Sequence, residues 1–354
     1  MFYYLILHGL QRIEGQRSPA AIYHLLQGRR SAQTIQDGNL YQLSEYFACY
    51  PTLSRADFNH GIVQLIEKDW IKVTAENLVY LTGKSHSFLN KYSQSFPLHY
   101  LHGGNYARAV PLFMKRIYLA IQTYTHLSVN NRNFDPIIDD YSVQNWIKSH
   151  YQQNRYQLKE WLIQLYDSLN GFLITLDSYS AELFVKRITA YQRIGATIQQ
   201  LAWQNNCSIH DIEIRLMAIF QHLLFHIDQH HLELFYPLTD YPFSTNVGFM
   251  TASAQKTYQM LKHGWSKDNI ASRRGLRPST VEDHIVEIVY ADPAFQLSAF
   301  IDEKSIGQIL EAIKVIQDHK LSSIKAFLNH QFSYFQIRLV LARYDKDKKK
   351  GNEV

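Results

Sequence analysis

The sequence has 354 residues, of which 46% are hydrophobic and 19% are charged. This length predicts two or three domains, and this composition excludes an intrinsically disordered chain. The two cysteines, Cys49 and Cys207, are too few for a disulfide framework or a cysteine-based zinc site. They favour a reducing compartment, and no run approaches the roughly 18 apolar residues of a membrane span. We therefore expect a cytoplasmic or nucleoid-associated protein.

Residues 1–95 predict a small domain of helices followed by a hairpin. The N-terminal run MFYYLILHGLQRIEGQR lacks a basic leader and a cleavage site, so we expect no signal peptide. Ser18 and Ser54 can each cap a helix, and Gly28 ends the first of these. The apolar stripe of the second helix consists of Phe58, Ile62, Leu65 and Ile66. Two alternating runs about a turn at 76–77 predict the hairpin. This order is typical of a winged-helix-like domain, with a generic α+β domain as the alternative.

Residues 96–250 keep apolar side chains at spacings of three and four, which predicts a helical scaffold. The helical stretches are 106–127, 143–173, 180–206 and 208–235. Gly171 is expected to interrupt the pattern. Residues 236–248 are rich in Pro, Ser, Thr and Asn and predict a linker to the last domain. The predicted fold is therefore mainly α.

Residues 251–345 predict a domain of short helices, followed by a basic tail at 346–354. The expected helices are Ala254–Lys262, Lys267–Arg274, Ser279–Tyr290, Glu303–Asp318, Ser322–Asn329 and Ser333–Arg343. From residue 251 onward the chain holds 16 Lys and Arg against 12 Asp and Glu, most of the net charge of +5. This excess permits nucleic-acid binding without requiring it, since a solvated lysine tail is a common alternative.

The stretch SKDNIASRRGLRPSTVEDHI, residues 266–285, begins with the pattern of a supporting helix and a tight turn. Ser266 can cap the helix, and Ile270 and Ala271 form its inward face. Gly275 can adopt the left-handed backbone that turns the chain.

A second helix follows this turn at once. Pro278 suits its first turn, and Ser279 with Glu282 predicts a capping box. Its buried stripe consists of Val281, Ile285 and Ile288. Together the two helices predict a helix-turn-helix, in which the second helix projects its N-terminal turn outward.

The helix-turn-helix suggests contacts to DNA. The candidate residues are Lys262, Lys267, Arg273, Arg274, Arg277, Ser279, Thr280 and His284. The three arginines bracket the turn, where they can meet phosphates, and Thr280 and His284 are expected near the groove. The acids Glu282, Asp283 and Glu287 oppose this, because carboxylates repel the DNA backbone, so strong sequence-specific reading is not expected. A helix-turn-helix that docks protein is the alternative.

Two regions carry a resemblance to a known family. The segment AAIYHLLQGRRSAQTIQDGNLYQLSEYFACYPTLSRADF, 20–58, resembles the N-terminal signature of the YpbB-like proteins of Gram-positive bacteria, which are typically encoded beside a RecQ-type DNA helicase. Residues 257–295 and 324–344 resemble the helix-turn-helix domain at the C-terminus of many RecQ-type helicases. The resemblance implies an accessory protein that supplies DNA contacts or a docking surface to a separate helicase.

Other motifs carry weaker signals. The run LTGKS, 81–85, ends like a phosphate-binding loop, but it lacks the required preceding glycine and no helix start is expected there. His222, His226 and His230 share one helical face; packing is the expected role, and a shared metal is the alternative. Arg29 and Arg30 adjoin a helix that Ser31 can cap, where they contact DNA or a partner or form an ion pair.

The sequence thus predicts a DNA-binding accessory protein that works with a RecQ-type helicase in DNA repair or recombination. The alternatives are a helical interaction scaffold that does not bind DNA and a transcriptional regulator. No catalytic constellation, metal site or cofactor site is predicted, and an enzyme is not expected.

Overall fold

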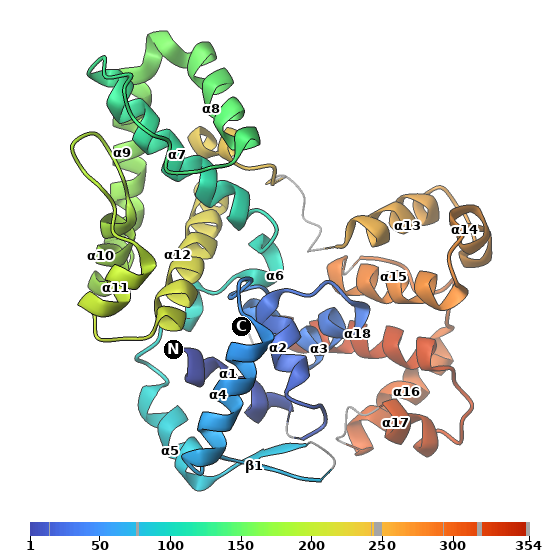
Figure 1. The fold of residues 1–354 in the computed structure, drawn as a ribbon. Helices are drawn as coiled ribbons and strands as arrows, with labels where there is room; N and C mark the ends of the chain where they lie inside the picture. The colour runs from blue at the N-terminus through green and yellow to red at the C-terminus, as the bar shows by residue number, and fades with distance from the viewer. Residues whose placement is uncertain are drawn as a thin grey trace. The chain divides into compact units, whose positions relative to one another are not determined.

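The computed structural model describes residues 1–13, 15–75, 78–241, 243, 250–292, 294–316 and 321–351, without the side chains of Ala32 and 344–351. The protein is mainly helical, as the sequence predicts, and the sheet within the described residues is a two-stranded hairpin (Figure 1). Among the helices that are described, none combines the length and the apolar character that a bilayer crossing needs.

The chain divides into two compact units, each built from segments far apart in the sequence. Unit 1 consists of Met1–Ile6, Ala48–Leu53 and Ser87–Ser244, and unit 2 consists of Leu7–Phe47, Ser54–His86 and Thr245–Val354. Helix α1 (Phe2–Ile13) contributes residues to both units. The sequence predicts three consecutive domains, whereas the compact units join N-terminal residues with the C-terminal helices. This grouping depends on long-range packing, which local patterns do not encode.

Unit 1 is a helical assembly in which α12 (Ile209–Gln229) packs on α7, α10 and α11. Its other elements are η2 (Leu98–Tyr100), α6 (Gly103–Tyr106), α7 (Val110–Ser128), α8 (Tyr141–Asn154), η3 (Arg155–Gln157), α9 (Leu158–Ile174), α10 (Ser178–Arg187), α11 (Ile198–Gln204) and η4 (Glu233–Leu238). Ser208 caps α12 by accepting from the backbone N–H of Asp211, whose carboxylate accepts from the N–H of Ser208. The apolar face of α12 is buried in this unit, as the predicted periodicity requires.

The helical pattern overstates the helix content of unit 1. Residues 188–197, within the predicted stretch 180–206, form a loop closed by reciprocal backbone hydrogen bonds between Ala190 and Arg193. These bonds satisfy backbone groups that a helix would otherwise pair. Conversely, Gly171 does not interrupt the pattern but lies inside α9. The predicted linker 236–248 begins inside η4, which ends at Leu238, and residues 242 and 244–248 of it lie outside the described residues.

The N-terminal part of unit 2 follows the predicted order of helices and hairpin. Its elements are α2 (Ala20–Gln27), α3 (Ala32–Leu40), η1 (Ser44–Tyr46), α4 (Arg55–Glu67), β1 (Ile71–Val73), β2 (Val79–Leu81) and the start of α5 (Gly83–Tyr92). The strands pair antiparallel with Ile71 opposite Leu81, which confirms the hairpin. The turn predicted at 76–77 lies outside the described residues.

Most of the predicted helix ends in this region are confirmed. Gly28 adopts a φ of 79° at the end of α2, and Ser54 caps α4 by accepting from the N–H of Asp57. Ser18 does not cap α2, because Pro19 occupies the N-cap position and no side chain bonds there. The predicted stripe of α4 is correct at Phe58 and Leu65, which are buried. It is wrong at Ile66, which is 44% exposed.

The C-terminal part of unit 2 centres on α15. Its helices are α13 (Ala252–Lys262), α14 (Lys267–Arg274), α15 (Pro278–Ala291), α16 (Glu303–Ile316), α17 (Leu321–Phe327) and α18 (Tyr334–Gly351). Helix α15 packs against α13, α14, α18 and the N-terminal helix α3, and Figure 1 shows α13 and α18 on opposite sides of it. From His284 onward every residue of α15 is buried.

The C-terminal end of the chain differs from the prediction. Helix α18 extends past Arg343, where the sequence predicts its end, through most of the predicted tail to Gly351. Residues 352–354 lie outside the described residues.

Candidate nucleic-acid interface

The first helix of the motif, α14, begins and ends where the sequence predicts. The hydroxyl of Ser266 accepts a hydrogen bond from the backbone N–H of Asn269 at 3.2 Å, which caps the helix. Ile270 and Ala271 are buried, as expected. Gly275 has a φ of 62°, a left-handed conformation that side chains with a Cβ rarely adopt. This turn leads directly into α15.

The second helix, α15, begins without a side-chain cap. Arg277 occupies the N-cap position and Pro278 the first turn, as predicted for Pro278. The predicted capping box is wrong, because Ser279 lies inside the helix and the carboxylate of Glu282 pairs instead with the ammonium of Lys267 at 2.7 Å. Among the described residues, no side-chain oxygen therefore caps the positive end of the helix dipole, a place that attracts anions.

The three arginines around the turn divide into two kinds. Arg273 and Arg277 are exposed, and their side chains form no hydrogen bond or ion pair with the described residues. Arg274 is partly buried and donates to the carbonyl and the hydroxyl of Ser253, each at 2.9 Å, and to the hydroxyl of Thr257. Burial lowers the pKa of Arg274. Two of the three guanidinium groups are therefore available to phosphates.

Two acids expected on the outward face of α15 are engaged inside unit 2. Asp283 accepts a hydrogen bond from the Nη1 atom of Arg338 at 2.6 Å. Glu287 is buried, and its carboxylate accepts from the backbone N–H and the hydroxyl of Thr251. Burial raises the pKa of Glu287, while the bonds from Thr251 and the charge of Arg30 oppose this shift. These carboxylates oppose DNA less than the sequence suggests.

The prediction that His284 contacts DNA is wrong, because its side chain is not at the surface of the helix-turn-helix. Its side chain is buried, and its Nδ1 atom lies 2.9 Å from the Thr257 hydroxyl oxygen. Burial lowers the pKa of His284, and the charge of Arg274 adds to this effect. The exposed Ser279 and the half-buried Thr280 are the predicted contacts that remain in the first turn. Of the predicted contacts on α15, these two hydroxyl groups are the ones that the described structure leaves at the surface.

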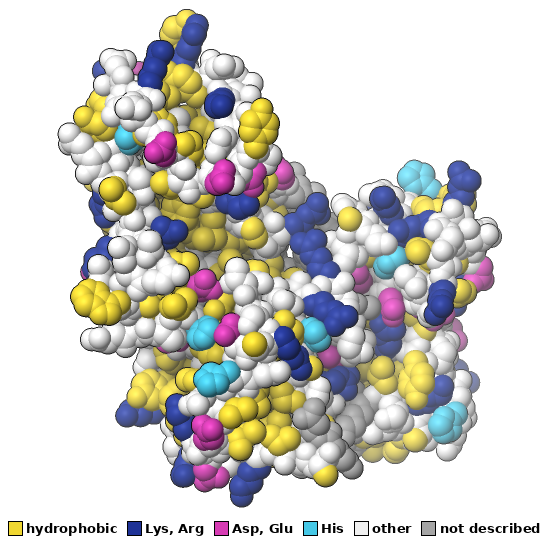
Figure 2. All heavy atoms as spheres, in the orientation of Figure 1, with side chains coloured by type: hydrophobic (Ala, Val, Ile, Leu, Met, Phe, Trp, Pro, Cys, Tyr) yellow, Lys and Arg dark blue, Asp and Glu magenta, His cyan; other side chains and the backbone are white. Residues whose placement is uncertain are grey.

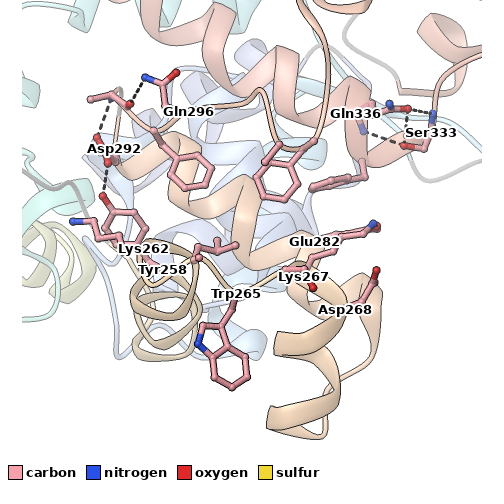
Figure 3. A pocket seen from close by; sticks show the side chains of 18 residues that line it. Tyr258, Lys262, Trp265, Lys267, Asp268, Glu282, Asp292, Gln296, Ser333 and Gln336 are labelled. Carbon is pink, nitrogen blue, oxygen red and sulfur yellow. Dashed lines mark hydrogen bonds and ion pairs between the residues drawn. The ribbon is translucent and has the colours of Figure 1, made fainter.

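The two predicted lysines lie beside an open groove (Figure 3). Lys267 pairs with Glu282, and its ammonium nitrogen lies 5.2 Å from the ring centroid of Phe335. The exposed Lys262 places its ammonium nitrogen 4.3 Å from the ring centroid of Tyr258. Lys267 is the first residue of α14, so about 9 Å of helix separates it from Arg273, and Arg277 lies beyond the other end of that helix. The lysines therefore belong to a different surface.

Arg29 and Arg30 are exposed and belong to the same unit as the helix-turn-helix. The Nη1 atom of Arg29 lies 3.1 Å from the Nε2 atom of His24. On the face of the molecule in Figure 2, Lys and Arg side chains of the described residues are interspersed with other types rather than gathered in one basic stripe.

The phosphate-loop-like run LTGKS has a structural role. The buried hydroxyl of Ser85 donates to the carbonyl of Trp70 at 2.8 Å, and Lys84 pairs with Asp69 at 3.1 Å. Helix α5 begins at Gly83, a helix start that the sequence analysis did not expect. These contacts connect the start of α5 to the residues that precede β1.

The histidines of α12 pack among aromatic rings in unit 1. The ring of His222 stacks on Tyr100 with centroids 4.6 Å apart, and its Nδ1 atom lies 3.1 Å from the Nε2 atom of His102. His226 and His230 have ring centroids 4.2 Å apart. Burial lowers the pKa of His102 and of His222 to about 4. Within the described residues no three potential ligands are arranged to hold a metal ion.

Arg338 contributes to the charge balance of the helix-turn-helix, a role that the sequence did not predict. It lies on α18 and donates to the side-chain oxygen of Gln36 at 2.9 Å as well as to Asp283. Its positive charge thereby balances the negative charge of Asp283, and its two hydrogen bonds link α3 to α15. No local pattern in α18 signals this role, because both partners are distant in the sequence.

Comparisons with known proteins agree with the helix-turn-helix. A family model described as a helix-turn-helix domain matches residues 253–341. Protein YpbB of Bacillus subtilis (strain 168) is 30% identical over 342 residues, which cover 96% of each chain. No solved structure matches the chain. Because the similarity to Protein YpbB extends over nearly the whole of both chains, this protein belongs to the YpbB family.

Proposed function

We propose that the protein binds duplex DNA through its phosphate backbone, at the turn between α14 and α15. The observation that carries this proposal is the exposure of Arg273 and Arg277 on either side of Gly275, without partners among the described residues. The uncapped N-terminus of α15 lies next to them and adds an attraction for anions. Arginines so placed contact phosphates and make binding strongly dependent on salt.

The contacts are largely independent of DNA sequence. A recognition helix reads bases along its exposed face in the major groove. In α15, residues 278–280, 282 and 283 are exposed or half-buried, whereas Val281 and every residue from His284 onward are buried, and α3, α13 and α18 pack against the helix. This burial favours an accessory role over that of a sequence-specific transcriptional regulator.

We further propose that the partner in this role is a RecQ-type helicase acting in DNA repair or recombination. The support is the resemblance of residues 257–295 and 324–344 to the helix-turn-helix domain at the C-terminus of such helicases. The test is unwinding of a forked duplex by a purified RecQ-type helicase. Addition of this protein is expected to raise the unwinding rate, and an unchanged rate together with no co-sedimentation would reject the partnership.

Titration of labelled duplex, forked and single-stranded DNA tests the proposed contacts. At low salt, Arg273→Ala and Arg277→Ala are each expected to raise the Kd about three- to tenfold and to reduce the salt slope by about one. Arg132→Ala removes an exposed arginine of unit 1 and is the matched control, with no expected change. Arg274→Ala is expected to lower the melting temperature instead, because it loses three internal hydrogen bonds.

Two results would reject DNA binding at this turn. One is an absence of binding to every DNA form at low salt. The other is wild-type affinity in the double variant Arg273→Ala, Arg277→Ala. The first result would favour the helical interaction scaffold, for which the burial of most of α15 is the supporting observation.

A further inference from the structure

An open groove of about 960 Å³ lies at the end of α14 away from the two exposed arginines. Its walls come from the end of α13, the start of α14, Glu282 of α15, residues 292 and 294–300, and the start of α18 (Figure 3). All of these segments belong to unit 2. The groove is therefore a feature of the helix-turn-helix part of the chain, distinct from the proposed DNA contacts.

Aromatic rings form a continuous series along this groove. Phe295 contacts Tyr258 edge-on at 6.0 Å between centroids and lies 6.1 Å from Phe300, with 18° between their planes. Phe300 in turn contacts Phe335 edge-on at 5.9 Å. Trp265, which is 42% exposed, lies at the edge of the groove (Figure 3). Ring faces of this kind attract cations through their quadrupoles.

The groove already holds cations on its rings. The ammonium groups of Lys262 and Lys267 lie over Tyr258 and Phe335, respectively. These two contacts come from the chain itself, yet they show the chemistry that this groove accepts. Phe295 and Phe300 have no such cation among the described residues.

Carboxylates of the groove outnumber its ammonium groups. Glu282 is compensated by Lys267. Asp292 accepts from the hydroxyl of Tyr258 and from the backbone N–H of Ala294, but no cation pairs with it among the described residues. Asp268 is exposed and has no hydrogen-bond or ion-pair partner within the described part of the chain. Two carboxylates therefore remain without a cation.

We propose that this groove binds a basic, extended segment of a partner protein and places Arg or Lys side chains over the rings near Asp268 and Asp292. The charge of the groove selects this occupant. A DNA strand or an acidic peptide would bring further negative charge to these carboxylates, and a purely apolar segment would leave them without a partner. An arginine side chain would make two favourable interactions here, because its planar guanidinium group can stack on an aromatic ring and pair with a carboxylate.

The groove does not depend on DNA binding, and it gives the helix-turn-helix part of unit 2 a second binding surface. The turn at Gly275 presents arginines for a polyanion, and the groove presents carboxylates and rings for a polycation. One protein partner could therefore dock in the groove while DNA occupies the turn.

Fluorescence anisotropy with defined peptides tests this inference on the full chain. The probes are fluorescein-labelled ten-residue peptides of alternating Arg-Ser, Gln-Ser and Glu-Ser. Saturable one-to-one binding of the Arg-Ser peptide is expected, with at least tenfold weaker binding of the other two. Asp268→Asn is expected to weaken the Arg-Ser peptide about threefold or more, and Phe300→Leu to weaken it as well.

A matched control separates this site from general charge effects. Glu160, like Asp268, is an exposed acid in the first turn of a helix, but it lies on α9 in unit 1. Glu160→Gln is expected to leave peptide binding unchanged. Equal effects of the Glu160 and Asp268 variants, equal affinity for the three peptides, or no saturable binding of the Arg-Ser peptide would each overturn the proposal. Arg273→Ala, Arg277→Ala should bind this peptide normally, so failure of the DNA proposal is distinguished from failure of this one.

Discussion

At the scale of single residues, the directions of the side chains decide which charged groups of the helix-turn-helix are exposed for binding. The sequence identifies the charged residues around Gly275 but not where each one points. Arg274 and Arg273 are neighbours, yet one is held by Ser253 and Thr257 and the other is exposed. Such directions depend on partners from other segments, so the candidate site could be predicted only in part.

A prediction at this scale concerns His284. Because Arg274 donates to the Thr257 hydroxyl, that hydroxyl can donate its own proton to the Nδ1 atom of neutral His284. Burial lowers the pKa of His284 in the folded protein. In the unfolded chain the same histidine has an ordinary pKa of about 6.5, so near and below that pH the unfolded chain binds more protons than the folded one. Stability from this group is therefore present at neutral pH and is lost as the pH falls through that range.

The variant His284→Gln should reduce this pH dependence, because its side-chain oxygen still accepts from Thr257 but does not titrate. Urea unfolding at pH 5, 6 and 7 measures the free energy at each pH. The exposed His263 provides the control, and His263→Gln should keep the wild-type profile. Identical profiles for the two variants would show that His284 does not contribute to the acid sensitivity.

At the scale of elements, some helix ends were predictable, such as those marked by Ser54, Ser266, Gly28 and Gly275, whereas the caps expected from Ser18 and Ser279 and the loop at 188–197 were not. The bounds of α14 agree with the prediction because Ser266 and Gly275 act locally. The loop interrupts a sequence with helical periodicity. Its shape is fixed by contacts such as the hydrogen bonds from Arg187 and Arg193 to the carbonyls of Ala196 and Val185. A hydrophobic period does not reveal such contacts.

Two glycines test this account of the elements. A Cβ at Gly195 would lie 2.3 Å from the carbonyl oxygen of Arg187, so Gly195→Ala must displace the loop and should cost about 1–3 kcal/mol of unfolding free energy. Gly171 lies inside α9 with open space beside it, so Gly171→Ala should stabilise by up to about 1 kcal/mol. Thermal and urea unfolding measure both changes. Equal destabilisation by the two substitutions would contradict the rigid loop.

At the scale of the whole molecule, the segments of unit 2 depend on one another. The sequence predicts a C-terminal domain of residues 251–345 that is separate from the N-terminal one. In unit 2, however, α15 and α18 both pack on α3, and Arg338 joins Gln36 of α3 to Asp283 of α15. Gln36 is only 3% exposed. Without the N-terminal segment, Arg338 would lose one partner and the faces of α15 and α18 against α3 would meet water.

A segment of residues 250–351 produced alone should therefore be less stable than the same helices in the full chain. Exposing packed apolar surface removes several kcal/mol, a large share of the stability of an ordinary domain. We expect a lower unfolding midpoint, binding of a hydrophobic dye, and recovery of the midpoint when residues 1–86 are co-expressed with the segment. A cooperative transition at the full-chain midpoint in the isolated segment would instead support an independent C-terminal domain. Since α3 covers part of α15 only in the joined unit, the isolated segment would also expose helix surface that the full chain withholds from DNA, so DNA affinities measured on it would not describe the full protein.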